Sequence, residues 1–161
     1  MAWDFAFPRT IPACSYTLDQ ILVALGPHTE KKRKHFQEGV LYLPDKGLDV
    51  FFVTLNKSDK DYSPSTMYRD YAINEEKFHW QSQSITSVES ATGQRYINQQ
   101  NNGNRVLILV RDYKKDGQAA VPYTCIGLAD YVSHYGSAPI SIVWKMHEPM
   151  PGFVLKEAVT V

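Results

Sequence analysis

The order of apolar and polar residues predicts a domain built mainly from β-strands. From Val40 onward, short apolar runs alternate with segments rich in Gly, Pro, Asn and Asp, a pattern typical of paired strands and turns. The strands that we expect cover residues 40–43, 49–55, 78–83, 106–110, 123–131 and 140–146. This pattern favours a mainly β (α+β) fold, either a curved and mostly antiparallel sheet or a small barrel.

A helix is expected before these strands, over residues 18–25. Thr17 and Gln20 have the spacing of a capping box, in which each side chain accepts a hydrogen bond from the other residue's backbone. Gly26 ends the helix. Four apolar residues fall on one helical face: Leu18, Ile21, Leu22 and Leu25. We therefore expect a single domain over 1–161, with an N-terminal helical lead-in of about 1–38 and a β core of about 40–150.

Composition and charge narrow the class of protein. Lys and Arg number 17, as do Asp and Glu, so the chain has no net charge with which to coat nucleic acid or membrane, although a local basic face is compatible with this balance. No apolar run approaches the roughly 20 residues of a membrane helix. The sequence has two cysteines, Cys14 and Cys125, and no signal-peptide pattern at its start, which favours a cytoplasmic location and reduced thiols.

Motifs for metals, cofactors and catalysis are missing from the sequence. The five histidines form no His-Glu-x-x-His pattern, there is no Cys-x-x-Cys pair, and no glycine-rich phosphate loop occurs. Asp45 and Asp49 resemble the acidic start of a metal-dependent nuclease site, but the strand from Asp49 ends in Leu55-Asn56-Lys57, with no acidic residue directly before that lysine. We therefore predict no catalytic residue, no metal and no cofactor. A small nucleic-acid hydrolase would need a set of groups that the sequence does not offer.

The aromatic content, 12%, is high, and the segment from Ser58 to Tyr96 combines aromatic, amide, hydroxyl and basic side chains. An extruded nucleic-acid base needs this combination, because its ring must be stacked and its hydrogen-bonding edge satisfied. Stacking contributes on the order of 1–3 kcal/mol per base, similar to the cost of unstacking. On residue types alone, a sheet with core aromatics and a solvated polar face explains the segment better.

Several short motifs favour the base-binding explanation over a sheet with core aromatics. They are Thr54-Leu55-Asn56-Lys57, Tyr62-Ser63-Pro64, Tyr68-Arg69-Asp70-Tyr71, Phe78-His79-Trp80-Gln81-Ser82-Gln83 and Thr92-Gly93-Gln94-Arg95-Tyr96. Together they resemble the uncharacterised C-terminal domain of bacterial phospholipase-D-like nuclease/helicase proteins. Those proteins are similar to type IV restriction enzymes that attack DNA with modified cytosine. The resemblance implies an SRA/PUA-like curved barrel that reads bases, and it leaves a stand-alone reader and an excised domain both open.

The resemblance also implies roles for individual residues. Trp80 and Tyr71 would stack on the base, Asp70 would accept from the cytosine amino group, and Gln81 or Gln83 would satisfy the rest of the edge. The expected base-binding pocket is Trp80, Tyr71, Asp70, Tyr68, Tyr62, Gln81, Gln83 and Ser82. The expected phosphate contacts are Lys57, Arg69, Lys77 and Arg95, while the run 31–34 is read first as solvated surface.

One conflict remains within this set. In an extended strand, Phe78, Trp80 and Ser82 point one way and His79, Gln81 and Gln83 the other, so Trp80 and the glutamines cannot share a pocket without a bend or bulge. His79 is read as a hydrogen-bonded sheet residue.

The function expected is a non-enzymatic DNA-binding module that flips a modified base, 5-methylcytosine or a relative, into an aromatic pocket. In this reading Trp80→Ala weakens binding to modified DNA and leaves the fold intact. RNA bases fit the same chemistry. The alternative is a coupling domain that docks on a helicase-nuclease partner, with the aromatic residues in the core and at the partner surface.

Overall fold

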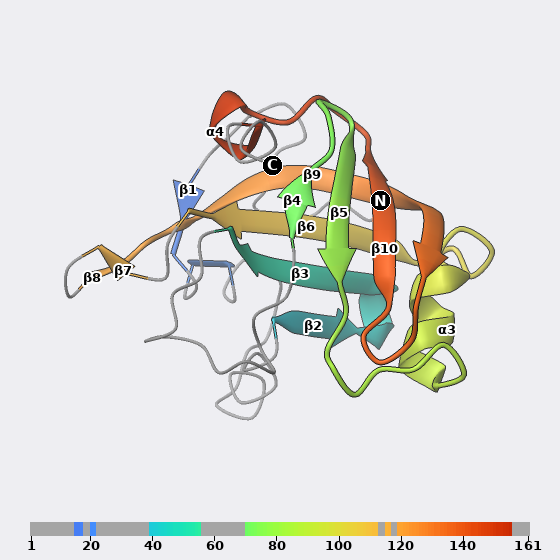
Figure 1. The fold of residues 1–161 in the computed structure, drawn as a ribbon. Coiled ribbons are helices and arrows are strands. Elements are labelled where there is room, and N and C mark those ends of the chain that lie inside the picture. Colours follow the sequence, from blue (N-terminus) through green and yellow to red (C-terminus); the bar gives the residue numbers. More distant parts are fainter. Residues whose placement is uncertain are drawn as a thin grey trace.

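The computed structural model describes residues 15–17, 20–21, 39–55, 70–112, 115–116 and 119–155. Eight strands in this part form one sheet (Figure 1). They are β1 (Ser15–Tyr16), β2 (Val40–Leu43), β3 (Leu48–Thr54), β4 (Tyr71–Ala72), β5 (Lys77–Gln81), β6 (Arg105–Arg111), β9 (Tyr123–Tyr135) and β10 (Ser141–Met146). The remaining elements are a hairpin of β7 (Lys115–Asp116) and β8 (Ala119–Ala120), a 3-10 turn (Pro44–Lys46), and helices α3 (Ala91–Ile97) and α4 (Gly152–Leu155).

The sheet is mixed and open. Its strand order is β2-β3-β6-β9-β10-β5-β4, with β1 paired to β9 outside this path. The β3–β6 ladder is parallel, and the other ladders between described strands are antiparallel. The mainly β expectation is therefore confirmed. The path has two ends, β2 and β4, which are not paired with each other, so the described sheet is curved and open rather than a closed barrel.

Strong bending divides the sheet into two halves that share β9. The first half contains β2, β3, β6 and the start of β9, and the second contains the end of β9, β10, β5 and β4. The ladder register shifts at Ile108/Leu109 and again at Val143/Trp144, and such bulges bend a strand and increase its twist. Figure 1 shows the result: β4, β5 and β10 cross over β2, β3 and β6 instead of running alongside them.

An aromatic core fills the space between the two halves. Phe51 of β3 stacks on Trp80 of β5, with ring centroids 4.0 Å apart, and Trp144 of β10 meets Phe51 edge to face at 5.5 Å. Tyr96 of α3 meets both Phe51 and Trp80 edge to face. Because these rings come from both halves and from α3, their packing fixes how the second half lies across the first.

A second core covers the other face of the first half. It contains aliphatic side chains of β2, β3 and β6, with Ile21 from the N-terminal segment fully buried among them. The predicted capping box is formed: Gln20 N donates to Thr17 Oγ1 at 3.2 Å, and Thr17 N donates to Gln20 Oε1 at 2.9 Å. Gln20 and Ile21 are helical, and the rest of the expected helix lies outside the described residues.

Helix α3 was not expected from the sequence. Ser90 caps its start, because its hydroxyl accepts a hydrogen bond from Gly93 N at 3.0 Å. Gly93 weakens the helical signal, yet the packing requires it: a Cβ there would lie 2.1 Å from the Ser87 carbonyl oxygen. The close approach of this helix to the preceding turn therefore explains why residue 93 is a glycine.

Candidate functional site

The two faces of β5 separate the predicted pocket residues. Phe78, Trp80 and Ser82 are buried on the inner side, and Lys77, His79 and Gln81 lie on the opposite, outer side. The neighbouring strand β10 extends this outer face, because Ser141, Val143 and Lys145 lie directly opposite Gln81, His79 and Lys77. The conflict in the sequence is thus resolved: Trp80 points into the core and Gln81 points away from it.

Trp80 is a core residue in this structure. It is 4% exposed and packs against Phe51, Tyr96 and Trp144. A base could stack on it only by displacing Phe51, so we remove Trp80 from the proposed pocket. For the same reason we now expect Trp80→Ala to destabilise the fold.

Ser82 and Gln83 also serve the fold. Ser82 is fully buried, and its hydroxyl accepts a hydrogen bond from Ile140 N at 2.9 Å. The Gln83 Oε1 atom accepts from Thr86 Oγ1 at 3.2 Å and from Tyr96 Oη at 3.3 Å. Both side chains therefore hold the turn that follows β5, and neither belongs to the outer face.

A cluster of aromatic and polar side chains occupies the outer face. The Tyr71 ring stacks on the His79 ring, with centroids 4.6 Å apart and planes 14° from parallel. His79 Nε2 lies 3.0 Å from the hydroxyl of Tyr135. His79 is only 4% exposed, whereas Tyr135 is 60% exposed. We call this set, together with Asp70, Gln81 and Ser141, the outer-face cluster.

Two hydrogen bonds arrange the amide end of the outer-face cluster. Asp70 Oδ1 accepts from the backbone N–H of Gln81 at 3.0 Å. The Gln81 side chain donates from Nε2 to Ser141 Oγ at 3.2 Å. Gln81 is partly buried, and these contacts hold it beside the rings of the cluster. The Tyr71 and Tyr135 rings, the Gln81 amide and the Asp70 carboxylate are thus at least partly exposed, while the Ser141 hydroxyl is buried beneath them and accepts from Gln81.

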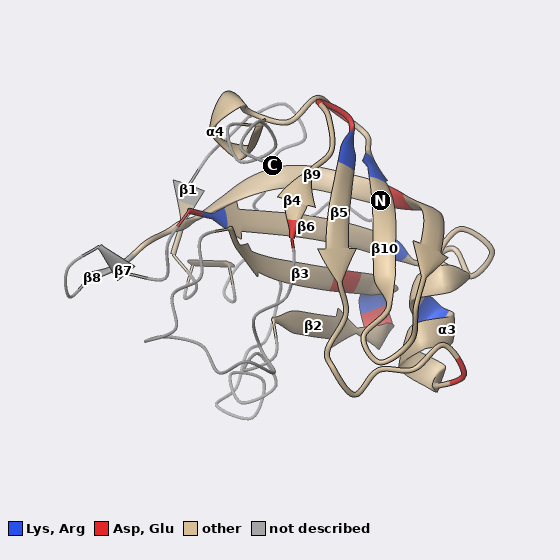
Figure 2. Cartoon of the chain, viewed as in Figure 1, with Lys and Arg blue, Asp and Glu red and all other residues tan. Residues whose placement is uncertain are grey.

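Two lysines mark the other end of this face. Lys77 and Lys145 are directly opposite each other on β5 and β10, and both are exposed. Figure 2 shows this as blue at the neighbouring ends of the two strands. Like charges in this arrangement repel each other, so the pair does not help to hold the strands together. Glu75 and Glu76, which immediately precede Lys77, are also exposed.

Arg95 has a structural partner instead of a free guanidinium. Its Nε and one terminal nitrogen donate to the two carboxylate oxygens of Asp49, each at 2.9 Å, and Asn104 donates to the same carboxylate at 2.8 Å. The guanidinium also lies 3.7 Å over the Tyr42 ring. Burial raises the pKa of Asp49, while Arg95 and Asn104 act to lower it.

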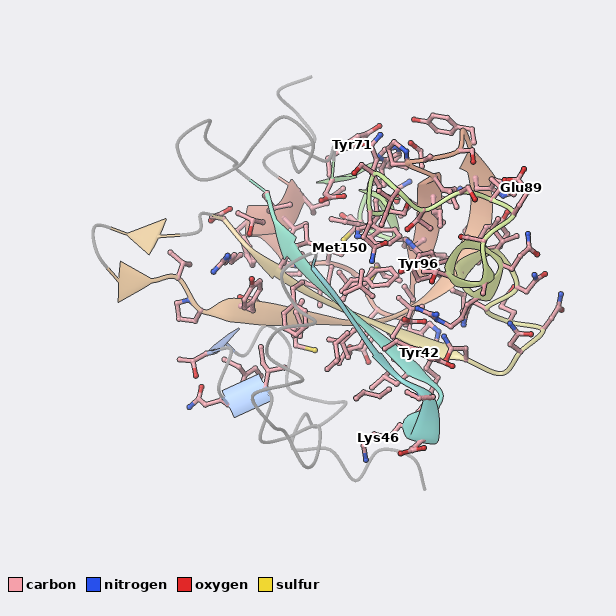
Figure 3. All side chains as sticks on the ribbon, turned by 90° about the horizontal axis from the view of Figure 1, so that it is seen from below. Tyr42, Lys46, Tyr71, Glu89, Tyr96 and Met150 are labelled. Carbon is pink, nitrogen blue, oxygen red and sulfur yellow. The ribbon has the colours of Figure 1, made fainter. Side chains whose placement is uncertain are left out.

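This contact joins α3 to β3 at one edge of the core. Figure 3 shows Tyr96 between Tyr42 and Tyr71, which places the Arg95 site away from the outer-face cluster. We therefore remove Arg95 from the proposed phosphate contacts.

The remaining predicted residues lie outside the described part: Lys57, Tyr62, Tyr68, Arg69 and the run 31–34. Of the predicted set, the structure brings together Asp70, Tyr71 and Gln81, with Lys77 on the same face. Sequence reasoning missed Tyr135, Ser141 and Lys145 and assigned His79 no chemistry. Ser141 and Lys145 alternate with apolar residues in 140–146, which is consistent with one shared face, but the pairing of β10 with β5 is a long-range contact that alternation does not reveal.

Other kinds of site are not seen in the described ranges. Within them, no group of three or more His, Cys, Asp or Glu side chains is placed to hold a metal ion. His147 Nε2 and Asp130 Oδ2 are 2.9 Å apart, and Asp130 Oδ1 also accepts from Gln99 Nε2 at 3.2 Å. The helices found there are also too short or too polar to cross a membrane.

A family comparison now adds to this geometry. The family model described as "Domain of unknown function (DUF3427)" matches residues 13–157, which is most of the sequence. The chain belongs to the DUF3427 family. No curated protein matches it. The matched range includes both halves of the sheet and the whole outer-face cluster, so the DUF3427 match covers the fold and the candidate site together.

Proposed function

We propose that this chain is a DNA-binding module that reads a modified base, 5-methylcytosine or a relative, on the outer face of β4, β5, β9 and β10. The observation that carries the proposal is the composition of that face. A stacked Tyr71–His79 pair, the Gln81–Ser141 amide-hydroxyl pair and two exposed lysines all lie on one side of the same strands. These groups match the needs of an unstacked nucleotide: a flat surface, an edge partner and a cation.

The spacing of these groups suits a nucleotide chain. Lys77 precedes His79 by two residues on the same face of β5, which is about 7 Å along a strand. Gln81 follows at the same interval. A phosphate near Lys77 and Lys145 would leave its base within reach of the Tyr71 ring and the Gln81 amide. Tyr71, which is half-buried, and Tyr135, which is exposed, are the rings in the cluster most open to a base.

The choice of modified cytosine and of an SRA/PUA-like fold rests on the resemblance of the sequence motifs to the C-terminal domain of nuclease/helicase proteins. The open, strongly bent sheet is compatible with that fold class. Asp70 keeps its proposed role as an acceptor near the base, through the carboxylate that already holds Gln81. On this basis the partner is duplex DNA, and a helicase-nuclease would act on the DNA that the module marks. No catalytic residue, cofactor or metal forms part of the proposal.

The deciding experiment is a binding titration by fluorescence anisotropy at a stated salt concentration. The chain is titrated against matched duplexes that contain cytosine, 5-methylcytosine or 5-hydroxymethylcytosine at one position. We expect selective binding to a modified duplex. Equal affinity for all three would overturn base reading, and no binding to any duplex would favour the coupling domain instead.

Tyr71→Ala tests the stacking surface. Loss of one base–aromatic contact, worth about 1–3 kcal/mol, weakens binding to the preferred duplex by about 5- to 150-fold. Tyr42→Ala is the matched control, because Tyr42 is an exposed tyrosine of the other half and stacks on Arg95. Circular dichroism verifies that both variants are folded. Equal losses in the two variants would remove Tyr71 from the site.

Lys77→Ala and Lys145→Ala test the phosphate contacts. Each lost contact lowers the dependence of log affinity on log salt by about 0.9, with the same loss for all three duplexes. Lys46→Ala is a control on the first half, where Lys46 is exposed in the turn before β3. An unchanged salt dependence in the double variant would show that DNA does not contact this end of the outer face.

A further inference from the structure

Ile85 is placed where folding alone does not explain it. It is 81% exposed, the most exposed of the large apolar side chains in the described ranges. It occupies the third position of a turn closed by the hydrogen bond from Thr86 N to Gln83 O at 3.0 Å. Turn positions of this kind favour Gly, Asn, Asp or Ser, whose side chains support the turn or avoid steric strain. An isoleucine gives the turn no such support and buries almost nothing.

The turn that carries Ile85 is firmly held from both sides. Thr86 is buried, its hydroxyl donates to Gln83 Oε1 at 3.2 Å, and its carbonyl accepts from Ala138 N at 3.0 Å. Gln83 is tied in turn to the Tyr96 hydroxyl of α3. A second bond joins Val88 N to the hydroxyl of Ser137, at 3.0 Å, in the loop between β9 and β10. The turn that carries Ile85 is therefore hydrogen-bonded to the loop between β9 and β10.

The surroundings of Ile85 identify the kind of partner. The residues around it in the segment 82–90 are mainly hydroxyl and amide side chains, with Glu89 as the charged residue. The core of a protein–protein interface is instead a continuous apolar patch. Within this segment Ile85 is the strongly exposed aliphatic side chain, since Val88 packs partly buried against the core. An isolated exposed aliphatic side chain resembles the apolar wedges of DNA-bending proteins, which enter a base step. The turn also directly follows β5 and Gln81 of the outer-face cluster.

We infer that Ile85 is a wedge that enters the base stack of duplex DNA beside the base read by the outer-face cluster. This inference rests on the proposed function and deepens it. Extrusion of a base leaves a gap in the stack, and a rigidly held aliphatic side chain fills that gap at little conformational cost. The wedge thus adds a stacking partner to the duplex at the moment when a base leaves it.

The test uses the full chain and a duplex with 2-aminopurine next to the modified cytosine. Emission from 2-aminopurine rises when its stacking is lost, so it reports local unstacking, and anisotropy reports binding in the same samples. We expect wild type to bind and to raise the emission. Ile85→Ser lowers affinity by about tenfold and abolishes the rise in emission. On a duplex with a mismatch at the read position, which is already partly unstacked, Ile85→Ser loses much less affinity.

The control is Ile73→Ser, which removes an exposed isoleucine at the opposite end of β5, where Ile73 N donates to Lys77 O. It keeps the rise in emission. A rise that is the same in wild type and Ile85→Ser would overturn the wedge and leave base reading intact. Failure of wild type to bind any duplex would overturn both proposals. Matching thermal unfolding curves show that the two variants differ in DNA contact and not in folding, because neither side chain is buried.

Discussion

The two halves of the sheet share one core but differ on their outer faces. The first half carries aliphatic side chains there, and they are covered by a second core that includes Ile21. The second half carries lysines, an imidazole, an amide and hydroxyls at corresponding positions of its strands. Both halves bury their inner faces against each other, so the polar outer face is not needed to form that core.

This difference indicates where the molecule has surface to use. Each leucine or valine of the second core contributes about 1.5–3 kcal/mol by being buried, which explains why the first half is apolar on both sides. The outer face of the second half lacks this stabilisation by buried aliphatic side chains. There, side chains are arranged by hydrogen bonds to one another, as in the Asp70–Gln81–Ser141 series. A binding surface needs such preformed polar groups.

The inner face should dominate stability, and Trp80→Ala is the strongest test of this. Removal of the indole from between Phe51, Tyr96 and Trp144 leaves a cavity in the aromatic core. We expect the free energy of unfolding to fall by about 4 kcal/mol, measured by urea denaturation. His79 is also nearly buried, so the control is Gln81→Ala, the next residue on the outer face, which should cost about 1 kcal/mol. Similar losses for both variants would contradict the assignment of the two faces.

Two isoleucines test how much the outer face of each half contributes to the free energy of unfolding. Ile21 is fully buried over the first half, and Ile73 is 43% exposed at the edge of the second. We expect Ile21→Ala to lower the free energy of unfolding by about 3 kcal/mol and Ile73→Ala by less than about 1 kcal/mol. Thermal and urea denaturation of both variants measure the difference. A small effect of Ile21→Ala would mean that the N-terminal segment does not stabilise the first half.

Local patterns in the sequence predicted much of this fold. The alternation of residues identified the β5 and β10 segments and their two faces, and the Thr17–Gln20 spacing identified a capping box. Helix α3 was missed because Gly93, which its packing demands, weakens the helical pattern. The short strand β4 was missed because two residues carry no periodicity.

The candidate site was harder to predict than the fold. Aromatic residues of the same type have opposite roles: Trp80 is in the core, and Tyr71, partly exposed, stacks on His79. Which of them faces outward depends on the pairing of β5 with β4 and β10, and this pairing spans about 60 residues of sequence between Gln81 and Ser141. Arg95 shows the same limit, since its partner Asp49 is 46 residues away. Residue types indicated which side chains could bind a base, and long-range strand pairing determines which of them face outward.

The smallest expected effect concerns Tyr131, at the point where β9 passes from the first half to the second. Its ring packs edge to face on Trp144, and its hydroxyl is hydrogen-bonded to His134 Nδ1 at 2.5 Å. Burial raises the pKa of Tyr131 above its ordinary value of about 10. The folded state therefore keeps this proton at a pH where the unfolded chain releases it. The contribution of protonated Tyr131 to the free energy of unfolding is complete below pH of about 10 and is lost as the pH rises further. Urea denaturation of wild type and Tyr131→Phe at pH 8 to 11 should show a stability difference that is constant at first and shifts against wild type above pH of about 10. A difference that stays constant over the whole range would show that the Tyr131 hydroxyl is equally solvated in both states, and that the partly covered bend of β9 resembles the open outer face more than the core.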